Sequence, residues 1–255
     1  MATLPRQEQI EQLRRRMAAV PGRVGAVAPQ SLAAAQAPEA TPELAPRTGG
    51  LPVPGPFEEL FPGRFLAKGS VVGLTGSRFA VLGFIASVTA ADGHVAVVGL
   101  PELSLLAVAE MGGDLRRVAV IPDPGPDPVE VAAVLLDGVD LVVLGLCGVQ
   151  VSYTRARAVT ARVRSKNAVL AIVDGQWPNP EVALESQICG YRGLGRGHGR
   201  IRGLSLAVQA SGRSFQQRRS TMRLTCMAGR VRWEAEETIT APVSFPDASA
   251  LGVGS

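Results

Sequence analysis

The pattern of apolar and polar residues divides the chain into three parts, of which the middle part is the most regular. Its apolar residues form five short runs, at residues 70–75, 94–100, 116–122, 139–146 and 168–174, separated by segments with a helical spacing. Because each run is continuously apolar, the strand that it predicts is buried on both faces. The pattern therefore predicts an α/β fold with a mostly parallel sheet flanked by helices.

The segments between the runs carry helix signals. Residues 78–91 are apolar almost all round, which predicts a buried helix. Asp127 and Pro128 begin another expected helix, as its N-cap and first helical residue, and Ser152 caps the next one. By the same signals, Asn179 and Pro180 predict a further helix over residues 179–190.

Beyond Gly190 the apolar residues recur at every second position, which predicts antiparallel strands, the last two forming a hairpin. The apolar positions of these strands are Leu204, Leu206 and Val208, then Met222, Leu224 and Cys226, then Val231, Trp233 and Ala235. The segment before them, YRGLGRGHGRIRG at residues 191–203, is rich in glycine and arginine and predicts a loop.

The N-terminal part predicts a helix on a flexible linker. Ile10, Leu13, Met17 and Val20 form one stripe of a helix that ends before Pro21. A helix this short is unstable alone in water, so the stripe is expected to dock on its own domain, on a partner or on another copy of the chain. The expected organisation is a helix at residues 1–20, an alanine- and proline-rich linker at 21–56, an α/β core with C-terminal antiparallel strands at 57–240, and a disordered tail at 241–255.

Charge and cysteine content narrow the functional classes. Residues 48–150 contain five basic and eleven acidic side chains, whereas residues 151–232 contain fifteen basic and three acidic ones. The basic half predicts either solvent-exposed arginine-rich helices or a surface for nucleic acid or an acidic partner. Cys147, Cys189 and Cys226 are too far apart for a zinc site or a disulfide framework, so we expect buried thiols in a reducing cytoplasm. No signal peptide or membrane span is expected.

Three stretches of the core resemble the RecA-type ATPases. LFPGRFLAKGSVVGLTG at residues 60–76 is similar to the lead-in and first core strand, GVDLVVLGL at 138–146 to the Walker B strand, and LAIVDGQWP at 170–178 to the strand that follows. The resemblance covers Pro52 to Arg232. With its N-terminal helix, linker and arginine-rich C-terminal region, the chain resembles the ImuA-like proteins of this superfamily, above all the actinobacterial ImuA-prime branch.

The residues that carry ATP chemistry in the RecA-type core are replaced in this chain. Counted from Gly76, the positions of the phosphate-binding lysine and hydroxyl fall on Leu82 and Gly83, and the Walker B acid falls on Gly145. Gly99 and Pro101 stand where the water-polarising glutamate is expected, and Glu102 is one residue out of register. All three chemical functions are missing together.

Gly76 and Ser77 are therefore expected to form a tight strand-to-helix turn, which keeps the geometry of a nucleotide site without its charges. It predicts a pseudo-ATPase with no catalytic residue, no cofactor and no metal. His94 and His198 have no serine or cysteine at a spacing typical of catalysis. Asp174 follows the last parallel strand and is expected to be a cap or an ion-pair partner. Arg78 can touch a phosphate only from the tip of the loop, and Trp177 is expected to pack at a strand end.

The resemblance implies a role in DNA-damage-induced mutagenesis. It implies a RecA-like scaffold, cytoplasmic and nucleoid-associated during damage, that binds ImuB, a Y-family polymerase-like protein without polymerase activity. Through ImuB it would join an error-prone replicative-type polymerase and the sliding clamp. The residues expected to bind the partner lie in the C-terminal strands: Arg213, Arg218, Arg219, Arg223, Arg230, Arg232 and Trp233. The alternative is that these strands only complete the domain.

Two further hypotheses assign the chain to other functional classes, a DNA-binding module and an ATPase. An ATP-independent DNA-binding module would use the arginines of the predicted loop, Arg192, Arg196, Arg200 and Arg202, to follow phosphates. A RecA-like ATPase with an unusual nucleotide site is the third hypothesis, and measurable ATP binding would support it.

Overall fold

The computed structural model describes residues 49–195 and 198–236, which belong to one compact unit. The five predicted apolar runs form parallel strands: β3 (Val71–Gly76), β4 (Val95–Val98), β5 (Val118–Ile121), β6 (Leu141–Gly145) and β7 (Val169–Val173). Alternate residues of these strands enter two apolar clusters, one on each side of the sheet. Burial on both faces explains the continuous apolar runs, and the prediction of a mostly parallel α/β sheet is confirmed.

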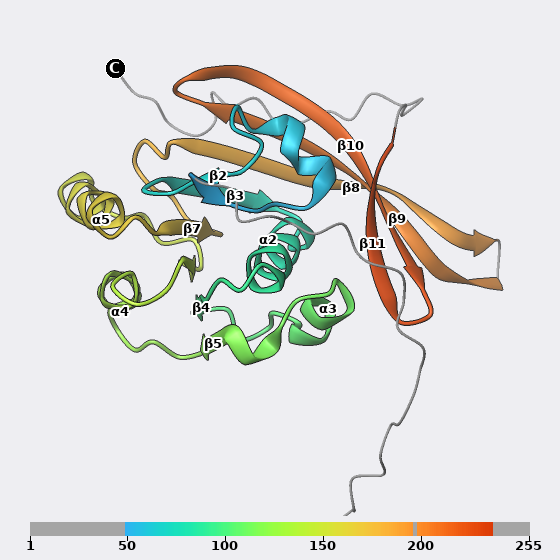
Figure 1. Cartoon of the computed structure of the whole chain (residues 1–255), viewed down its shortest axis with the longest axis horizontal. Coiled ribbons are helices and arrows are strands. Elements are labelled where there is room, and N and C mark those ends of the chain that lie inside the picture. The colour runs from blue at the N-terminus through green and yellow to red at the C-terminus, as the bar shows by residue number, and fades with distance from the viewer. Residues whose placement is uncertain (1–48, 196–197, 237–255) are drawn as a thin grey trace, which may run out of the picture. The chain divides into compact units, whose positions relative to one another are not determined.

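Four more strands extend this sheet. β8 (Val182–Gly195) pairs in parallel with β3 and antiparallel with β9 (His198–Gly212), and β10 (Phe215–Met227) and β11 (Arg230–Ala235) follow as antiparallel strands. The strand order is β11-β10-β9-β8-β3-β7-β6-β4-β5 (Figure 1). Ala228 and Gly229 both have positive φ and form the tight turn between β10 and β11. The predicted C-terminal hairpin is therefore confirmed.

Helices cover both faces of the parallel part (Figure 1). α2 (Phe79–Ala90) and α3 (Leu105–Glu110) pack on one face, and α4 (Pro128–Leu135) and α5 (Tyr153–Lys166) pack on the other. The Asp127 side chain caps α4 by accepting a hydrogen bond from the Glu130 backbone N–H, as predicted. α2 is buried almost all round, also as predicted.

The helix predicted over residues 179–190 is wrong, because most of this segment forms β8. Asn179 has a φ of 50°, a left-handed conformation rather than the extended one of an N-cap. Along β8, Leu184 and Ser186 are buried whereas Ala183 and Gln187 are exposed, which is the period of a strand. Pairing with β3 on one side and β9 on the other outweighs the local helix signals.

The loop predicted over residues 191–203 is also wrong, because β8 and β9 continue as a hairpin through this segment. β3 pairs with β8 only as far as Ser186, and β10 pairs with β9 only as far as Gly203. We call residues 187–195 and 198–202 the β8–β9 arm. The arm extends beyond the rest of the sheet (Figure 1), so each of its strands has one edge without a neighbouring strand among the described residues.

The folded domain begins earlier than the sequence predicts. Residues 49–56, assigned to the linker, include β1 (Gly50–Leu51), which pairs with β2 (Leu66–Ala67), and the buried Val53. A short 3-10 helix, η1 (Gly55–Leu60), follows. The predicted N-terminal helix, residues 21–48 of the linker and the predicted tail at 241–255 lie outside the described residues.

An aromatic cluster fastens the antiparallel strands to the core. Phe57 of η1 contacts Phe84 of α2 and Trp233 of β11 in edge-to-face geometry, with ring centroids 5.2 and 5.1 Å apart. Such pairs contribute about 0.5–1.5 kcal/mol beyond the area that they bury. Residues that are distant in sequence thus meet at one point, and β11 is joined to the core by side-chain packing as well as by strand pairing.

Candidate functional site

The turn after β3, at the predicted nucleotide loop, is short and closed. α2 begins at Phe79, three residues after Gly76. The Ser77 backbone N–H donates to the carbonyl of Ser186 in β8 over 2.8 Å, and the Ser186 hydroxyl donates back to the Ser77 carbonyl over 3.0 Å. Gly76 has a φ of 86°, and a Cβ there would collide with the Ser186 carbonyl. These contacts place β8 directly against the turn.

The positions counted for the lysine and the hydroxyl lie inside the domain. Leu82 is in the second turn of α2 with 5% of its surface exposed. At Gly83 a Cβ would come within 2.9 Å of both Pro54 and the Trp233 ring. The expected tight strand-to-helix turn at Gly76 and Ser77 is confirmed. The geometry of a nucleotide loop is not kept, because the positions counted for the lysine and the hydroxyl lie within a buried helix.

An ion-pair cluster lies at the ends of the strands next to this turn. Arg78, at the N-cap of α2, places its Nη2 atom 2.8 Å from Glu102 Oε1 and 2.5 Å from Asp174 Oδ2. Glu102 follows β4 and Asp174 follows β7, so the three charges join loops from three strands. We call the loops that follow β3, β4, β6 and β7 the carboxyl edge, which is where open α/β sheets bind ligands. The expectation that Asp174 is an ion-pair partner is confirmed.

The Walker B position is closed by backbone packing. A Cβ on Gly145, the last residue of β6, would lie 2.5 Å from the carbonyl oxygen of Gly99 and 2.6 Å from the Leu100 side chain. Real Cβ atoms do not approach other atoms so closely, so a carboxylate at this position requires the end of β4 to move. The neighbouring Pro101 is exposed, and Glu102 is held by Arg78.

The other candidate catalytic residues lie elsewhere or are packed. His94 immediately precedes β4 at the amino end of the parallel strands, opposite the carboxyl edge, with Nε2 3.5 Å from Arg117 Nη1. Trp177 is buried in the apolar cluster beneath α4 and α5, as expected. The side chain of His198 lies outside the described residues.

Several predicted partner-binding arginines are occupied by contacts within the domain. Arg213 pairs with Glu181 over 3.7 Å. Arg218 donates to the carbonyl of Glu59 over 2.9 Å and stands 5.6 Å over the Phe215 ring. These contacts fasten the end of the β9–β10 hairpin to its neighbours.

The remaining predicted partner-binding residues divide into two groups. Arg219 donates to Gln209 over 2.8 Å, Arg223 pairs with Glu236 over 2.5 Å, and Trp233 packs into the aromatic cluster. These contacts favour the alternative that this part of the C-terminal strands completes the domain. Arg230 and Arg232, on β11, are exposed and form no ion pair with any described residue.

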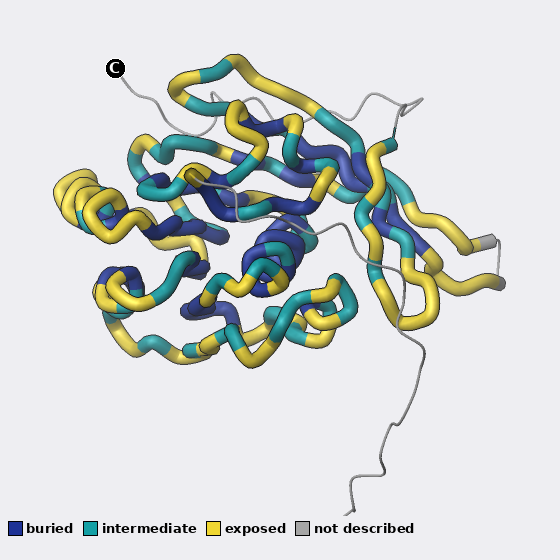
Figure 2. Tube along the Cα trace, viewed as in Figure 1, coloured by how far each residue is buried: buried dark blue, intermediate teal, exposed yellow. Residues whose placement is uncertain are grey.

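Exposed apolar and basic residues gather on the β8–β9 arm and on the β10–β11 turn. Tyr191, Leu194, Ile201 and Met227 expose 56%, 56%, 53% and 71% of their surface. Figure 2 shows that both hairpin ends are mostly exposed. Within residues 49–195 and 198–236, no carboxylate pairs with the neighbouring arginines, Arg200, Arg202, Arg230 and Arg232. We call these eight residues the hairpin-end surface.

Of the other predicted DNA-binding arginines, Arg192 pairs with Glu236 over 3.1 Å, and Arg196 lies outside the described residues.

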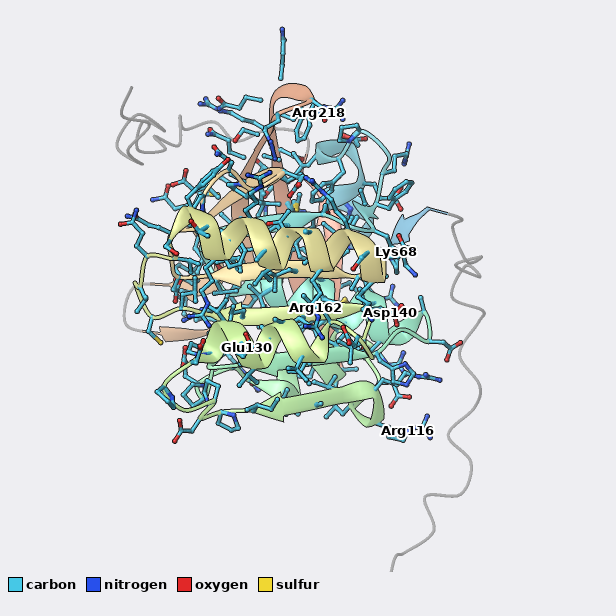
Figure 3. All side chains as sticks on the ribbon, turned by 90° about the vertical axis from the view of Figure 1, so that its left-hand side faces the viewer. Lys68, Arg116, Glu130, Asp140, Arg162 and Arg218 are labelled. Atoms are coloured by element: carbon cyan, nitrogen blue, oxygen red, sulfur yellow. The ribbon has the colours of Figure 1, made fainter. Side chains whose placement is uncertain are left out.

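The arginines of α5 are largely neutralised, unlike those of the hairpin ends. Arg155 pairs with Asp127, and Arg162 pairs with Asp137 over 2.9 Å, so α5 is joined to α4. Figure 3 shows Arg162 between the two helices. Hydrogen bonds from these arginines lower the pKa values of both carboxyl groups. Part of the charge difference between the two halves of the sequence is thus compensated by ion pairs between α5 and α4.

The role of one carboxylate, that of Glu236, was not predicted from the sequence. Glu236, just after β11, accepts hydrogen bonds from Arg192 of β8 and Arg223 of β10, and so ties the two strands together. Burial alone would raise the pKa of Glu236, but hydrogen bonds from Arg223, Ser205 and Arg192 outweigh burial and lower it. The only sign of this role in the sequence is that two acidic residues end a predicted strand within an otherwise basic region.

The cysteines are more exposed than the sequence predicts. The expectation of three buried thiols is wrong, because Cys147 and Cys226 are exposed and only Cys189 is half-buried. Burial, followed by the nearby charge of Glu236, raises the pKa of the Cys189 thiol. Across residues 49–195 and 198–236, no group of three histidine, cysteine or acidic side chains is arranged to hold a metal.

A membrane-spanning helix requires about 20 apolar residues. No helix in the described ranges has the length and apolar character to cross a bilayer.

The fold and the site define a class: an α/β protein whose carboxyl edge is closed by its own ion pairs and whose antiparallel strands end in exposed hairpins. The chain is 45% identical to the uncharacterized protein Rv3395c of Mycobacterium tuberculosis over 213 residues, 81% of this chain and 93% of that protein. The chain therefore belongs to the family of this mycobacterial protein. Residues 59–179 also match the family described as the MT3502 N-terminal domain.

A solved structure, that of a KaiC-like protein from the archaeon Pyrococcus horikoshii, is similar with a TM-score of 0.48 and 10% sequence identity. The similarity covers 72% of this chain and 97% of the archaeal chain.

Proposed function

We propose that this protein is a non-catalytic, RecA-like scaffold of SOS-induced error-prone translesion DNA synthesis, which binds an ImuB-type Y-family polymerase-like partner. The observation that carries the proposal is the contrast between two groups of arginines. Arg78 at the carboxyl edge is bound by two carboxylates, whereas the four arginines of the hairpin-end surface have no acidic partner among the described residues. We therefore assign partner binding to the hairpin-end surface and no chemistry to the carboxyl edge.

The absence of ATPase activity is part of this proposal. A nucleotide would need a loop that wraps its phosphates, a cation beside them and an acid to hold the magnesium ion. Support comes from the short turn at Gly76, from the burial of Leu82 and from the steric exclusion of a side chain at Gly145. Titration calorimetry of the full-length chain with ATP and Mg²⁺ tests it. We expect no saturable heat, and saturable binding would instead support the unusual-ATPase hypothesis.

The composition of the hairpin-end surface fits a protein partner. Exposed apolar residues beside arginines are typical of protein interfaces, in which aromatic residues and arginine are enriched. Leu194, Ile201 and Met227 are large apolar side chains on the surface of a folded domain, and a partner would remove them from water. Association through such a surface is expected to persist at high salt, because apolar burial is not screened.

The experiment that tests partner binding is a pull-down of the ImuB-type protein with point variants of the full-length chain. Removing the C-terminal strands is unsuitable, because Met222 and Leu224 are buried and the variant would not fold. We expect Ile201→Asp with Arg202→Glu to abolish partner retention. Arg157→Glu, which reverses an exposed arginine of α5 instead, should retain the partner. Retention by both variants would contradict the assignment to the hairpin ends.

A second candidate function, ATP-independent DNA binding, is favoured by one observation. Tyr191 is an exposed aromatic residue on the same arm as Arg200 and Arg202, and this combination can stack a base and neutralise phosphates. Fluorescence anisotropy with labelled single-stranded DNA tests it. Binding of this kind should be lost between about 50 and 200 mM salt, whereas association through a mainly apolar interface should not.

A further inference from the structure

We propose that the outer edge of β5 is a second interaction surface, which accepts the β8–β9 arm of another copy of this chain. β5 is the last strand at one end of the sheet, and β4 is the only strand that pairs with it among the described residues. The backbone groups on its other side have no strand partner in that part of the chain. The accepting edge is a different surface from the hairpin-end surface, but the arm that docks on it carries Arg200, Ile201 and Arg202 of that surface. The proposal does not depend on the identity of the polymerase-like partner.

Within β5 there is no charged residue, no proline and no bulge, which are three of the features that usually protect a terminal strand. The strand is short, which is a fourth such feature, and Arg117 and Pro122 flank it. The four residues of β5 are Val118, Ala119, Val120 and Ile121, and their pairing with β4 continues without a register shift. The edge can therefore add another strand over these four residues.

Both faces of β5 are partly open to solvent. Val118 packs against the cluster under α2 and α3, and Ile121 packs against the cluster under α4 and α5, so alternate residues of β5 face opposite sides. Ala119 is exposed, and Val120 exposes 37% of its surface. The helices cover the central strands of the sheet and leave β5 partly uncovered.

One unpaired acid lies beside β5. Residues 101–140 contain eight acidic and two basic side chains, but five of the acids form ion pairs within the domain: Glu102, Asp114, Asp127, Asp137 and Asp140. The two basic residues, Arg116 and Arg117, are paired with Asp114 and Asp92, over 2.9 and 2.7 Å. Asp123, two residues after β5, is exposed and forms no ion pair with any residue in the described ranges. The segment that adds to β5 is therefore expected to be basic.

The β8–β9 arm has the matching chemistry. In β9, residues 199–202 lie beyond Gly203, the last residue that pairs with β10, so their outer edge has no strand partner within the described part of the chain. Arg200 and Arg202 share one face of this strand, and Ile201 lies on the other. Two unpaired edges of similar length, one carrying two arginines and the other with Asp123 beside it, and both with exposed apolar side chains, are thus present on one molecule.

The two edges cannot meet within a single copy. Five strand spacings separate β8 from β5 in the sheet, which corresponds to about 24 Å. The arm also extends away from β5 (Figure 1). The contact is therefore between copies and joins two different surfaces, so it can close into a ring or continue as an open chain. Because each strand contributes only four residues, we expect weak, micromolar association.

The test is the mass of the full-length protein in solution, measured by sedimentation across a range of concentrations. We expect the mass to rise with concentration at about 50 mM salt and to fall to that of a monomer at about 500 mM. Val120→Lys, which places a charge on the β5 edge, should weaken association about tenfold or more. Val149→Lys, at an exposed valine on the carboxyl edge, is the matched control and should leave association unchanged.

Mixing two charge-reversed variants makes the test specific to this pair of surfaces. Arg200→Glu with Arg202→Glu reverses the charge of the arm, and Asp123→Arg reverses the charge beside β5. Each variant alone should remain a monomer, and an equimolar mixture of the two should associate. A wild-type monomer at all concentrations, or association that Val120→Lys and the arm reversal leave intact, would overturn the proposal. Partner retention by Val120→Lys separates this result from the proposed function, since that variant keeps the hairpin-end surface.

Discussion

The carboxyl edge and the hairpin-end surface both carry arginines, and the two regions use them differently. At the carboxyl edge, Arg78 is shared between Glu102 and Asp174, and the loops around it are joined by these contacts. At the hairpin ends, Arg200, Arg202 and their neighbours on β11 face solvent without an acidic partner among the described residues. An arginine that is already paired within the domain has its charge and some of its N–H donors satisfied, whereas an unpaired arginine can bind a partner.

The comparison teaches that the location of a site in a fold does not determine where function lies. The carboxyl edge is the usual ligand site of an open α/β sheet, but in this chain it is occupied by protein contacts. The exposed apolar residues and unpaired charges are found instead on strands that extend beyond the sheet. The largest effects on stability are therefore expected at the closed region, and effects on binding at the open one.

The largest effect on stability is expected from restoring the missing lysine. Leu82→Lys places an ammonium group in the interior of α2, where the leucine is 5% exposed. An uncompensated buried charge costs about 3–5 kcal/mol, and we expect no gain of ATP binding. Urea unfolding and calorimetry with ATP measure the two results, and Leu82→Met is the control, with a cost below about 1.5 kcal/mol. A stable Leu82→Lys variant that binds ATP would show that the region is not closed.

A smaller effect is expected from removing the aromatic contact that joins β11 to the core. Trp233→Ala deletes the β11 ring that contacts Phe57 and lies over Gly83. Because Trp233 is only partly buried, we expect a loss of about 3 kcal/mol, at the low end for this substitution. Urea unfolding provides the measurement. Tyr191→Ala, on the exposed arm, should change stability by no more than about 0.5 kcal/mol. Equal stability losses in Trp233→Ala and Tyr191→Ala would contradict this prediction.

The ion-pair cluster itself is expected to contribute modestly. All three side chains at the carboxyl edge are about one-third exposed or more, so solvent screens their attraction. We expect Arg78→Ala to lower the free energy of unfolding by about 1 kcal/mol, and the loss should shrink when salt is added. Arg202→Ala, which removes an unpaired arginine, should leave stability unchanged. A loss with Arg202→Ala as large as that with Arg78→Ala would mean that the arm arginines are not free.

The last effect depends on pH and concerns the base of the hairpins. Hydrogen bonds from Arg223, Ser205 and Arg192 lower the pKa of Glu236 in spite of its burial. The unfolded chain therefore binds the proton more tightly than the folded chain, so this stabilisation is present above the ordinary glutamate pKa of about 4.3 and is lost as pH falls below it. We expect the stability of Glu236→Gln to depend less on pH in this range. Parallel pH profiles for the variant and the wild-type protein would contradict this role.

The parallel part of the fold was predictable, because strands buried on both faces must be continuously apolar and the helices between them carry caps such as Asp127. β8 was not, because local signals at Asn179 and Pro180 are those of a helix, and only pairing with β3 and β9 makes the segment a strand. Likewise, glycine and arginine in residues 191–203 suggested a loop, although two paired strands tolerate this composition.

Only part of the candidate site was predictable. Counting residues from Gly76 is enough to show that the phosphate-binding lysine is replaced by Leu82 and that the Walker B acid is replaced by Gly145. Asp174, expected to be a cap or an ion-pair partner, does form an ion pair. The closure of the turn by Ser186 depends on a strand that lies more than 100 residues away. Whether an arginine is paired or free depends on such contacts, so the sequence could not separate Arg223 from Arg232.

The most direct test of the central claim is the affinity of the full-length chain for the ImuB-type partner, compared between two single variants. Arg202→Glu alters the hairpin-end surface, and Arg78→Ala alters the carboxyl edge. We predict a loss of about tenfold or more for Arg202→Glu and an unchanged affinity for Arg78→Ala. The opposite result, with the loss at Arg78→Ala and full affinity at Arg202→Glu, would place the function at the carboxyl edge and contradict the account.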